Sequence, residues 1–323
     1  MNTTALISLT PNSTSETTLR PSFEGTNICT WIGFKHVNYL VEEAVLNHFR
    51  SAGFGPGRLF EEFGVGFDTV DIKTRILHAL HIDDLVRAEV IQLAEKDGVA
   101  WFRIYLFLDR DGMEVKAVSA KTGVVLRREN RHSGSAAELP KELQVFAVDT
   151  LNRGEQKTVP FKGGSIAGRN QVTSEVDSAL LTKGGQALAW HWRIPYFYCH
   201  HTVRLQMSGL LRNMEEIVDL FVEENNASIR TLLDEQDWIP VVPVSHITMF
   251  GEALMEEEIL TVFEVEHVFK QSTYAARMDT YAIRGESLIL ISTGTITHGY
   301  AHIGSRSDWS LIEFDDRLMA AVK

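Results

Sequence analysis

Several side chains that could activate water stand close together near the start of the chain. His36 and Asn38 lie two positions apart, and the acids Glu42 and Glu43 follow shortly after them. A histidine has an unperturbed pKa near neutrality, so His36 could take a proton from water at physiological pH. A general base in this segment would therefore be His36 or one of the two acids, with Asn38 positioning the base or its substrate.

The same residues also have purely structural explanations. His36 could be solvated or could cap a helix, and an asparagine such as Asn38 is a common side-chain cap at a helix start. Acids in a first helical turn, such as Glu42 and Glu43, favour the helix dipole whatever their chemistry. Residue type alone therefore leaves both explanations open.

Two other groups of residues suggest chemistry less strongly. His78 and His81 precede Asp83, but the matching positions in the second half hold no comparable set, so we predict no metal site. Cys199 stands beside two histidines on an expected strand, where a lone cysteine is more often structural than nucleophilic. We therefore expect neither group to be catalytic.

The elements that must position these side chains can be read from hydrophobic period. Residues 37–50 carry apolar side chains at the spacing of an amphipathic helix, and the glycines at 53 and 55 end it. Residues 71–76, 85–90, 101–108 and 115–120 alternate as strands do, and residues 109–112 have the Asp and Gly chemistry of a hairpin turn.

This order of elements recurs later in the chain. The acidic and apolar positions of residues 42–45 recur at 215–218, an offset of 173. Those of residues 78–85 recur at 252–259, an offset of 174. The sequence therefore predicts two α+β units, each with one long helix, several antiparallel strands and a short terminal helix. We expect a flexible N-terminal arm over 1–24, a first domain over 25–150, a linker over 151–190 and a second domain over 191–323.

Bulk properties narrow the function. A chain of 323 residues favours two domains, and its formal net charge of −12 argues against a nucleic acid partner. The two cysteines are far apart, and the first residues lack the features of a signal peptide. No stretch is apolar for long enough to cross a membrane. We therefore expect a cytoplasmic protein without a membrane partner.

Residues 33–40, 42–44 and 50–54 together resemble the start of the hot-dog thioesterases. The relatives are the 4-hydroxybenzoyl-CoA type, the Tol-Pal-associated acyl-CoA thioesterases and the plant acyl-ACP thioesterases. In these a glycine-containing loop leads through a His-x-Asn element into a central helix. The stretch from Ile76 to Val90 also resembles the second and third strands of this family, with Asp83 and Asp84 at the turn. The resemblance implies a tandem double hot-dog, in which each unit is a curved antiparallel sheet wrapped around a central helix.

The resemblance further implies a thioesterase that acts on acyl-CoA or acyl-carrier protein without a cofactor. Its active site would lie at the interface of two hot-dog units, where a helix N-terminus polarises the thioester carbonyl. A homodimer of such chains is an option that we keep open. A 3-hydroxyacyl-thioester dehydratase and a non-catalytic acyl-thioester binding protein are the alternative functions.

The sequence departs from the family at one important position. Many relatives carry an aspartate three residues before the loop glycine, where Thr30 stands in the first unit and Gln206 in the second. The absence of both carboxylates favours the binding protein, and an enzyme would need another base. We expect His36, helped by Asn38, or one of Glu42 and Glu43. The expected substrate-binding residues are Thr30, Gly33, Tyr39, Gln206, Gly209, Arg212 and Asn213, with Arg212-Asn213 in place of the His-x-Asn element.

Overall fold

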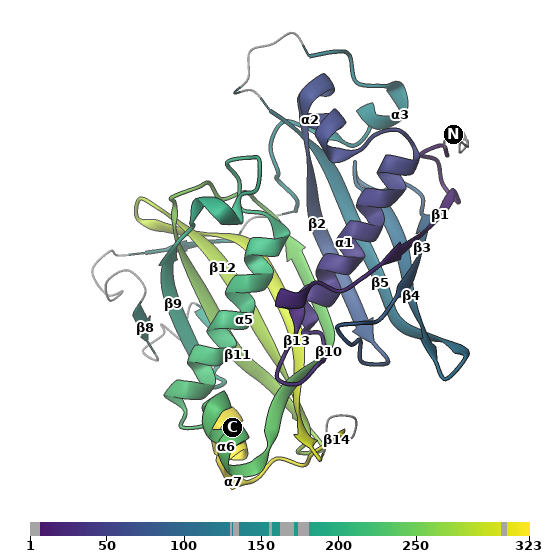
Figure 1. Ribbon diagram of the computed structural model, residues 1–323. Coiled ribbons are helices and arrows are strands. Elements are labelled where there is room, and N and C mark those ends of the chain that lie inside the picture. Colours follow the sequence, from purple (N-terminus) through teal and green to yellow (C-terminus); the bar gives the residue numbers. More distant parts are fainter. Residues whose placement is uncertain are drawn as a thin grey trace. The chain divides into compact units, whose positions relative to one another are not determined.

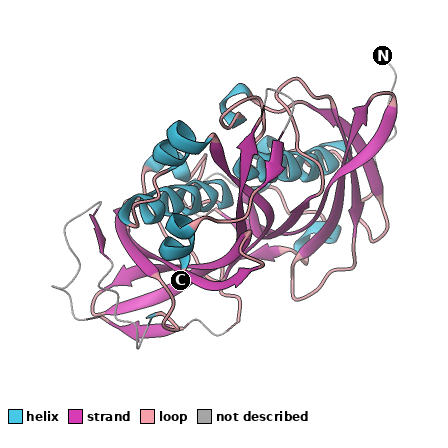
Figure 2. Cartoon of the chain, turned by 90° about the horizontal axis from the view of Figure 1, so that it is seen from below, coloured by secondary structure: helices cyan, strands magenta, loops and turns pink. Residues whose placement is uncertain are grey.

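The computed structural model describes residues 7–129, 131, 136–154, 157–161, 171–173, 181–304 and 309–323. The chain divides into two units, Met1–Leu151 and Asn152–Lys323. In each unit one long helix lies against one face of an antiparallel sheet (Figures 1 and 2). Because the helix and the strands are separate in sequence, each unit is α+β, as the hydrophobic period predicted.

The long helix of the first unit is α1 (Phe34–Ser51), which includes the predicted helix and begins three residues earlier. Val37, Val41, Ala44 and Val45 are fully buried, so the apolar stripe faces the sheet. The chain leaves the helix at Gly53, whose φ of 84° is accessible to glycine at little cost. This stripe fixes which side of α1 meets the sheet.

The first unit has five main strands in the order β1-β3-β4-β5-β2, and every neighbouring pair is antiparallel. The β4–β5 turn has positive φ at both Asp111 and Gly112, which is the two-residue hairpin geometry that the sequence predicted. The elements other than α1 are β1 (Thr14–Leu19), η1 (Phe23–Gly25), α2 (Pro56–Phe63), β2 (Val65–Ile76), β3 (Val86–Gln92), β4 (Ala100–Arg110), β5 (Met113–Arg128), α3 (Lys141–Gln144) and β6 (Ala147–Val148).

The second unit has the strand order β8-β9-β11-β12-β13-β10, and β7 and β14 also pair with β13. Its long helix α5 (Met207–Glu224) packs on this sheet through Phe221, whose ring lies 4.3 Å from that of Phe263. The other elements are β7 (Thr158–Pro160), β8 (Gln171–Thr173), β9 (Ala187–Arg193), η2 (Tyr196–Tyr198), α6 (Ile229–Gln236), β10 (Trp238–Met249), β11 (Glu258–Phe269), β12 (Thr273–Arg284), β13 (Ser287–Ile303), β14 (Trp309–Leu311) and α7 (Asp316–Val322).

The two units repeat one another at an offset of 173 residues over much of their length. Helices α1 and α5 start 173 residues apart and each has 18 residues. Helices α2 and α6 have 8 residues each, strands β2 and β10 have 12 each, and both pairs keep the same offset. The recurrence seen in the sequence is therefore a repeat of the whole unit.

The acids that precede the second strand of the repeat hold the same turn in both units. Asp84 accepts a hydrogen bond from the backbone N–H of His81 at 2.7 Å and pairs with Arg110 at 2.7 Å. In the second unit, Glu257 accepts one from the N–H of Leu254 at 2.6 Å and pairs with Arg284 at 3.0 Å. We call each of these acids with its arginine a turn clasp. The two turn clasps recur at the same place in both units and therefore serve the scaffold.

The structure differs from the sequence expectation at the predicted arm and linker. Strand β1 lies within residues 1–24 and pairs along its length with β3. Strands β7, β8 and the start of β9 lie within residues 151–190, and the units divide after Leu151 rather than across a linker. Strands β1, β7 and β8 are short and largely polar, so they carry little periodic signal and the sequence pattern missed them.

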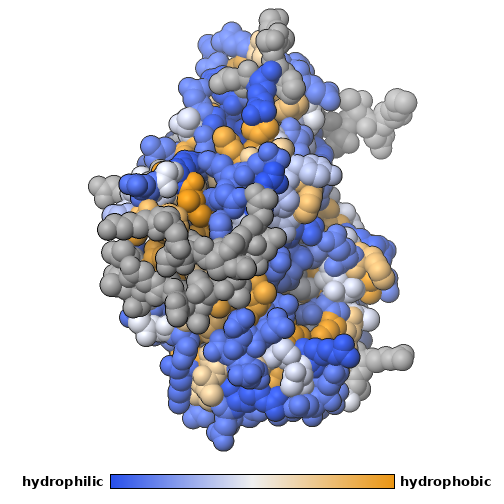
Figure 3. Space-filling model, turned by 90° about the vertical axis from the view of Figure 1, so that its left-hand side faces the viewer, coloured by the Kyte–Doolittle hydropathy of each residue, from blue (hydrophilic) through white to orange (hydrophobic). Residues whose placement is uncertain are grey.

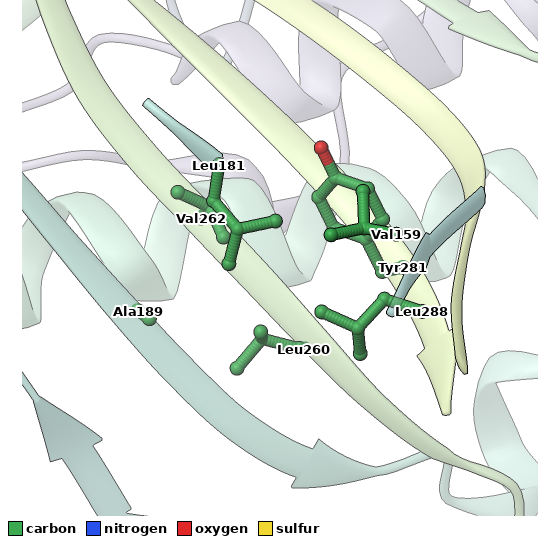
Figure 4. Close-up of a cluster of buried hydrophobic side chains, with 7 residues drawn as sticks. All are labelled: Val159, Leu181, Ala189, Leu260, Val262, Tyr281 and Leu288. Atoms are coloured by element: carbon green, nitrogen blue, oxygen red, sulfur yellow. The ribbon is translucent and has the colours of Figure 1, made fainter. Parts of the chain in front are cut away.

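The stretch predicted as a linker also covers part of a sheet. Val159 and Leu181 pack in one buried cluster with Leu260, Val262 and Tyr281 (Figure 4). Because alternate strand residues face opposite sides and Phe263 faces α5, Leu260 and Val262 face away from that helix. The second unit is therefore packed on both faces of its sheet.

Candidate functional site

The site in the first unit is built on the first three turns of α1. Gly33 is the N-cap, and its carbonyl accepts hydrogen bonds from the N–H groups of His36 and Val37 at 3.0 and 3.1 Å. A glycine has no side chain to cap the helix, so the remaining N–H groups of this turn have no side-chain acceptor from the cap. Such a helix start carries a partial positive charge.

His36 is packed beneath the loop that precedes the helix. Its side chain is 6% exposed, and its Nδ1 lies 3.2 Å from the hydroxyl of Ser22. A Cβ on Gly25 would come within 2.8 Å of the His36 ring, so this glycine makes room for the imidazole. The ring of Tyr39 lies 4.8 Å from that of His36. The structure therefore gives His36 a clear packing role.

Asn38 joins the helix to the sheet. It is 1% exposed, donates from Nδ2 to the carbonyl of Phe34 at 2.9 Å and accepts from the hydroxyl of Thr74 at 2.7 Å. It therefore does not cap the helix, because Gly33 holds that position. Asn38 therefore contacts β2 through Thr74, whereas His36 contacts the loop before the helix.

Glu42 lies one turn further along the same side of α1. The hydroxyl of Thr69 donates to its Oε1 at 2.6 Å, and Asp68, the neighbour of Thr69 on β2, is 8% exposed. Burial raises the pKa of Glu42, and the nearby carboxylates of Glu43 and Asp68 raise it further, while the Thr69 hydrogen bond opposes them. A carboxylate with a raised pKa is suited to accept a proton near neutral pH.

Glu43, the neighbouring acid, has a different environment. Its side chain is 42% exposed and forms an ion pair with Arg50 at 2.5 Å on the surface of the helix. Such exposed pairs contribute little to stability and leave the acid in solvent. Of the two acids that the sequence predicted as candidate bases, Glu42 contacts β2 through Thr69, whereas Glu43 pairs with Arg50 on α1 itself.

Thr30, which stands where relatives carry an aspartate, contacts a histidine. Its hydroxyl lies 2.9 Å from Nδ1 of His81, and burial lowers the pKa of His81. The backbone carbonyl of Thr30 also accepts from the N–H of Ile82 at 3.0 Å. Thr30 and His81 thus join the loop before α1 to the turn held by Asp84.

The predicted residues of the second unit fall at other positions of the repeat than expected. At the offset of 173 set by the two helices, Gly209 corresponds to His36, and Arg212-Asn213 corresponds to Tyr39-Leu40. Gln206 is the N-cap of α5 and corresponds to Gly33, so it does not match Thr30. The expected equivalence to the His-x-Asn element was therefore wrong, because it took Gly209 as the loop glycine.

Gly209 and Gln206 both have packing or hydrogen-bonding roles in the second unit. A Cβ on Gly209 would lie 2.8 Å from Tyr198, the residue of η2 that corresponds to Gly25. In the first unit the glycine is in the loop and the large residue is in the helix, whereas in the second unit the large residue is in the loop and the glycine is in the helix. Gln206 is 6% exposed and donates to the hydroxyl of Thr202 at 3.2 Å. Arg212 is half-buried.

Asn213 belongs to a buried polar row between α5 and the sheet. Its Oδ1 accepts from the hydroxyl of Thr261 at 2.8 Å, and Thr261 accepts from the indole N–H of Trp192 at 3.1 Å. Thr280 and Ser292 continue this row on the next two strands. The same register in the first unit holds Ala88, Leu106 and Val118, which are apolar. At this register the described residues are therefore polar in the second unit and apolar in the first.

The cysteine and histidines near residue 200 do not form a nucleophilic pair. Burial raises the pKa of the Cys199 thiol to about 11, so it is protonated at neutral pH. His200 instead lies 2.6 Å from the hydroxyl of Ser208. Over the described ranges, no three His, Cys, Asp or Glu side chains are grouped as metal ligands would be.

Sequence reasoning missed the β2 side of the site. Asp68, Thr69 and Thr74 all contribute to it, and they lie in β2, in which most residues are buried and Lys73 and Arg75 are exposed. The usable signal was the presence of several polar residues in a strand whose neighbours are buried, since such groups require partners. The sequence did not show which helix residues those partners are.

Comparison with solved structures identifies the fold. The chain aligns with a provisionally assigned oleoyl thioesterase from Lactobacillus plantarum at 10% identity and a TM-score of 0.57, covering 89% of this chain and 96% of that one. It aligns with an acyl-ACP thioesterase from Bacteroides thetaiotaomicron at 12% identity and a TM-score of 0.52, covering 88% and 97%. It also aligns with a 12:0-ACP thioesterase from Umbellularia californica at 11% identity and a TM-score of 0.53, and that alignment covers 88% of this chain and 93% of the other.

These alignments cover both units, so the chain has the double hot-dog fold that the residue pattern of the first unit suggested. No family model matches the sequence, and no curated protein matches it either. Among the described residues, no helix has both the length and the apolar character needed to cross a bilayer.

Proposed function

We propose that this protein hydrolyses acyl thioesters of coenzyme A or of an acyl-carrier protein, with Glu42 as the general base. The double hot-dog fold supports the reaction class, because the similar structures are described as thioesterases. The observation that carries the residue assignment is the environment of Glu42. It is a half-buried carboxylate with a raised pKa, held by Thr69 at 2.6 Å.

The proposed reaction needs no cofactor. Ionised Glu42 takes a proton from water while the water oxygen attacks the carbonyl carbon of the thioester. The tetrahedral intermediate then expels the sulfur, and the proton on Glu42 passes to the leaving thiolate. The products are a carboxylic acid and a free thiol. Thr69 keeps one carboxylate oxygen fixed, so the other faces the water in a constant direction.

A thiol-release assay tests the proposed function. Purified protein is given a panel of acyl-CoAs and acyl-carrier proteins, and free thiol is followed over time. We expect release from at least one substrate, and we expect Glu42→Gln to slow it by roughly 10²- to 10⁴-fold because the base is lost. The neighbouring Glu43→Gln is the matched control and should leave the rate nearly unchanged.

The same assay separates the alternative functions. Substrate binding without thiol release would indicate a binding protein, and hydration of an enoyl thioester without thiol release would indicate a dehydratase. His36→Ala tests the other base that the sequence suggested. A large loss of rate in a folded His36→Ala protein, with Glu42→Gln unaffected, would transfer the role to His36 and contradict our assignment.

A further inference from the structure

One face of the first unit's sheet carries a concentrated group of exposed cations. Lys121 on β5 pairs in register with Arg103 on β4 and with Lys73 on β2, so these three side chains lie in one row across three adjacent strands. Arg75 and Lys116 extend the group, and all five side chains are exposed. We call these five residues the basic face.

The basic face points away from α1. Phe102 contacts Phe49 of α1, and strand residues alternate, so Trp101, Arg103 and Tyr105 lie on the opposite side. The ammonium groups of Lys116 and Lys121 each lie 4.3 Å from an aromatic ring centre, over Tyr105 and Trp101 respectively. These cation–π contacts hold the lysines close to the sheet, so the charge lies near its surface.

The charge of this face is opposite to that of the chain. The protein has a formal net charge of −12, yet within the described part of the chain none of the five cations is joined to a carboxylate by an ion pair. Clustered like charges repel one another unless an opposite charge approaches. The face therefore fits a partner that presents several carboxylates.

Helix α5 of the same chain presents such carboxylates. Glu216, Asp219 and Glu223 are exposed and lie at the i, i+3, i+7 spacing of one helix face. The pKa of Glu216 is raised by burial and, to a smaller extent, by the neighbouring carboxylate of Asp219. The pKa of Asp219 is raised in the same way by burial and by Glu223. We call these three residues the acidic stripe. Its carboxylates would gain from an added cation.

The spacings of the two surfaces match. Neighbouring strands lie about 4.8 Å apart, so Arg103, Lys121 and Lys73 span roughly 10 Å across the sheet. A helix rises about 1.5 Å per residue, so the three carboxylates are spaced roughly 4.5 and 6 Å along the axis. A helix lying across the strands can therefore set one carboxylate against each cation.

We propose that the basic face of one molecule binds the acidic stripe on α5 of a second molecule of this chain. If two molecules exchange these surfaces, both contacts are equivalent and the assembly closes as a two-fold dimer. Figure 3 shows one side of the chain, where hydrophilic residues predominate among those coloured. The proposed contact is made between charged side chains, so salt should weaken it.

Complementary charge reversal tests the proposal. One variant carries Lys73→Glu and Lys121→Glu, and the other carries Glu216→Lys and Asp219→Lys. Mass is measured by sedimentation for each protein alone and for their mixture, at roughly 0.05 M and 0.5 M salt, which differ in screening length. Lys35→Glu with Lys141→Glu is the control for net charge, since both lysines lie outside the basic face.

We expect wild-type dimers at low salt that dissociate at high salt. Each reversed variant should be monomeric alone, with a Kd raised at least about tenfold, and the mixture of the two should dimerise again because both contacts regain opposite charges. A monomeric wild type at low salt would overturn the proposal, as would dimers in either variant alone or a mixture that stays monomeric. Binding of an acidic carrier protein to the basic face of a monomeric chain would overturn the choice of partner.

Discussion

The two units share a scaffold but differ in their buried polar groups. Both contain the turn clasp, formed by Asp84 with Arg110 in one unit and by Glu257 with Arg284 in the other. The first unit alone ties its helix to β2 through Glu42 and Thr69. The second unit instead has a polar row under its helix, which includes Asn213 and other fully buried residues.

This difference separates structural contacts from candidate functional ones. A polar contact that recurs at the same place in both units is needed by the fold, because both copies require it. A polar contact present in one copy costs desolvation that the other copy avoids with apolar residues. Such contacts are the places where the two units can differ in chemistry. Glu42 is the clearest of them.

The largest expected effect concerns acid stability in the second unit. His298 is 2% exposed and stacks on Tyr274, and burial lowers its pKa to about 3. The unfolded chain binds this proton near pH 6.5, so stability is lost as the pH falls from about 6.5 towards 3. The loss should reach roughly 5 kcal/mol by pH 3.

Denaturant unfolding measured against pH checks this expectation. His298→Phe should lower the slope by about one proton between pH 6.5 and 3, whereas the exposed His78→Gln should keep it. His48, the buried histidine of the first unit, has its pKa lowered by burial to about 4, so its own slope of the same sign should remain in His298→Phe and end near pH 4. An unchanged slope in His298→Phe would show that this group is not responsible.

The next largest effect concerns the contact between each long helix and the loop before it, where a glycine faces a large side chain. Gly25→Ala places a Cβ against His36, and Gly209→Ala places one against Tyr198, so each should destabilise by about 1–3 kcal/mol. Adding His36→Gly to Gly25→Ala should recover part of the loss, because the clash is between these two residues. Strictly additive unfolding free energies in this double variant would contradict the contact.

The turn clasps should contribute equally in the two units. Arg110→Met and Arg284→Met each remove an arginine that binds one acid and a backbone carbonyl of the preceding loop, and Arg110 also donates to the carbonyl of Asp109. Both arginines are partly exposed, so each loss should be about 1 kcal/mol. Unfolding midpoints in urea measure it. A loss confined to one variant would mean that the clasp is not a common scaffold feature.

The smallest effect concerns the stability cost of Glu42. Its pKa is raised, so the stability that it contributes is present at low pH and is lost as the pH rises through its folded pKa. Glu42→Gln should therefore match wild type in acid and be more stable by up to about 1 kcal/mol at pH 8. If the substitution destabilised the protein at pH 8, the carboxylate would be a structural partner instead.

The sequence predicted the scaffold better than the site. The hydrophobic period and the repeat at 173 were enough for the long helix, the main strands and two α+β units, since both patterns follow from burial, whereas the double hot-dog was predicted from the resemblance of residues 33–54 to a known family. The partners of Glu42 and Asn38 were not predictable, because the pairing of α1 with β2 is a tertiary contact. The alignment of Gln206 with Thr30 failed because it followed a glycine rather than the start of the helix.

The most direct test of the central claim is kcat/KM for thiol release against pH in Glu42→Gln and in Glu215→Gln, the same helix position in the second unit. We predict that Glu42→Gln loses roughly 10²- to 10⁴-fold in kcat/KM, together with the rise in rate that follows ionisation of Glu42. Glu215→Gln should keep both the rate and the profile. Equal losses in the two variants, or an unchanged profile in Glu42→Gln, would contradict the assignment of the chemistry to the first unit.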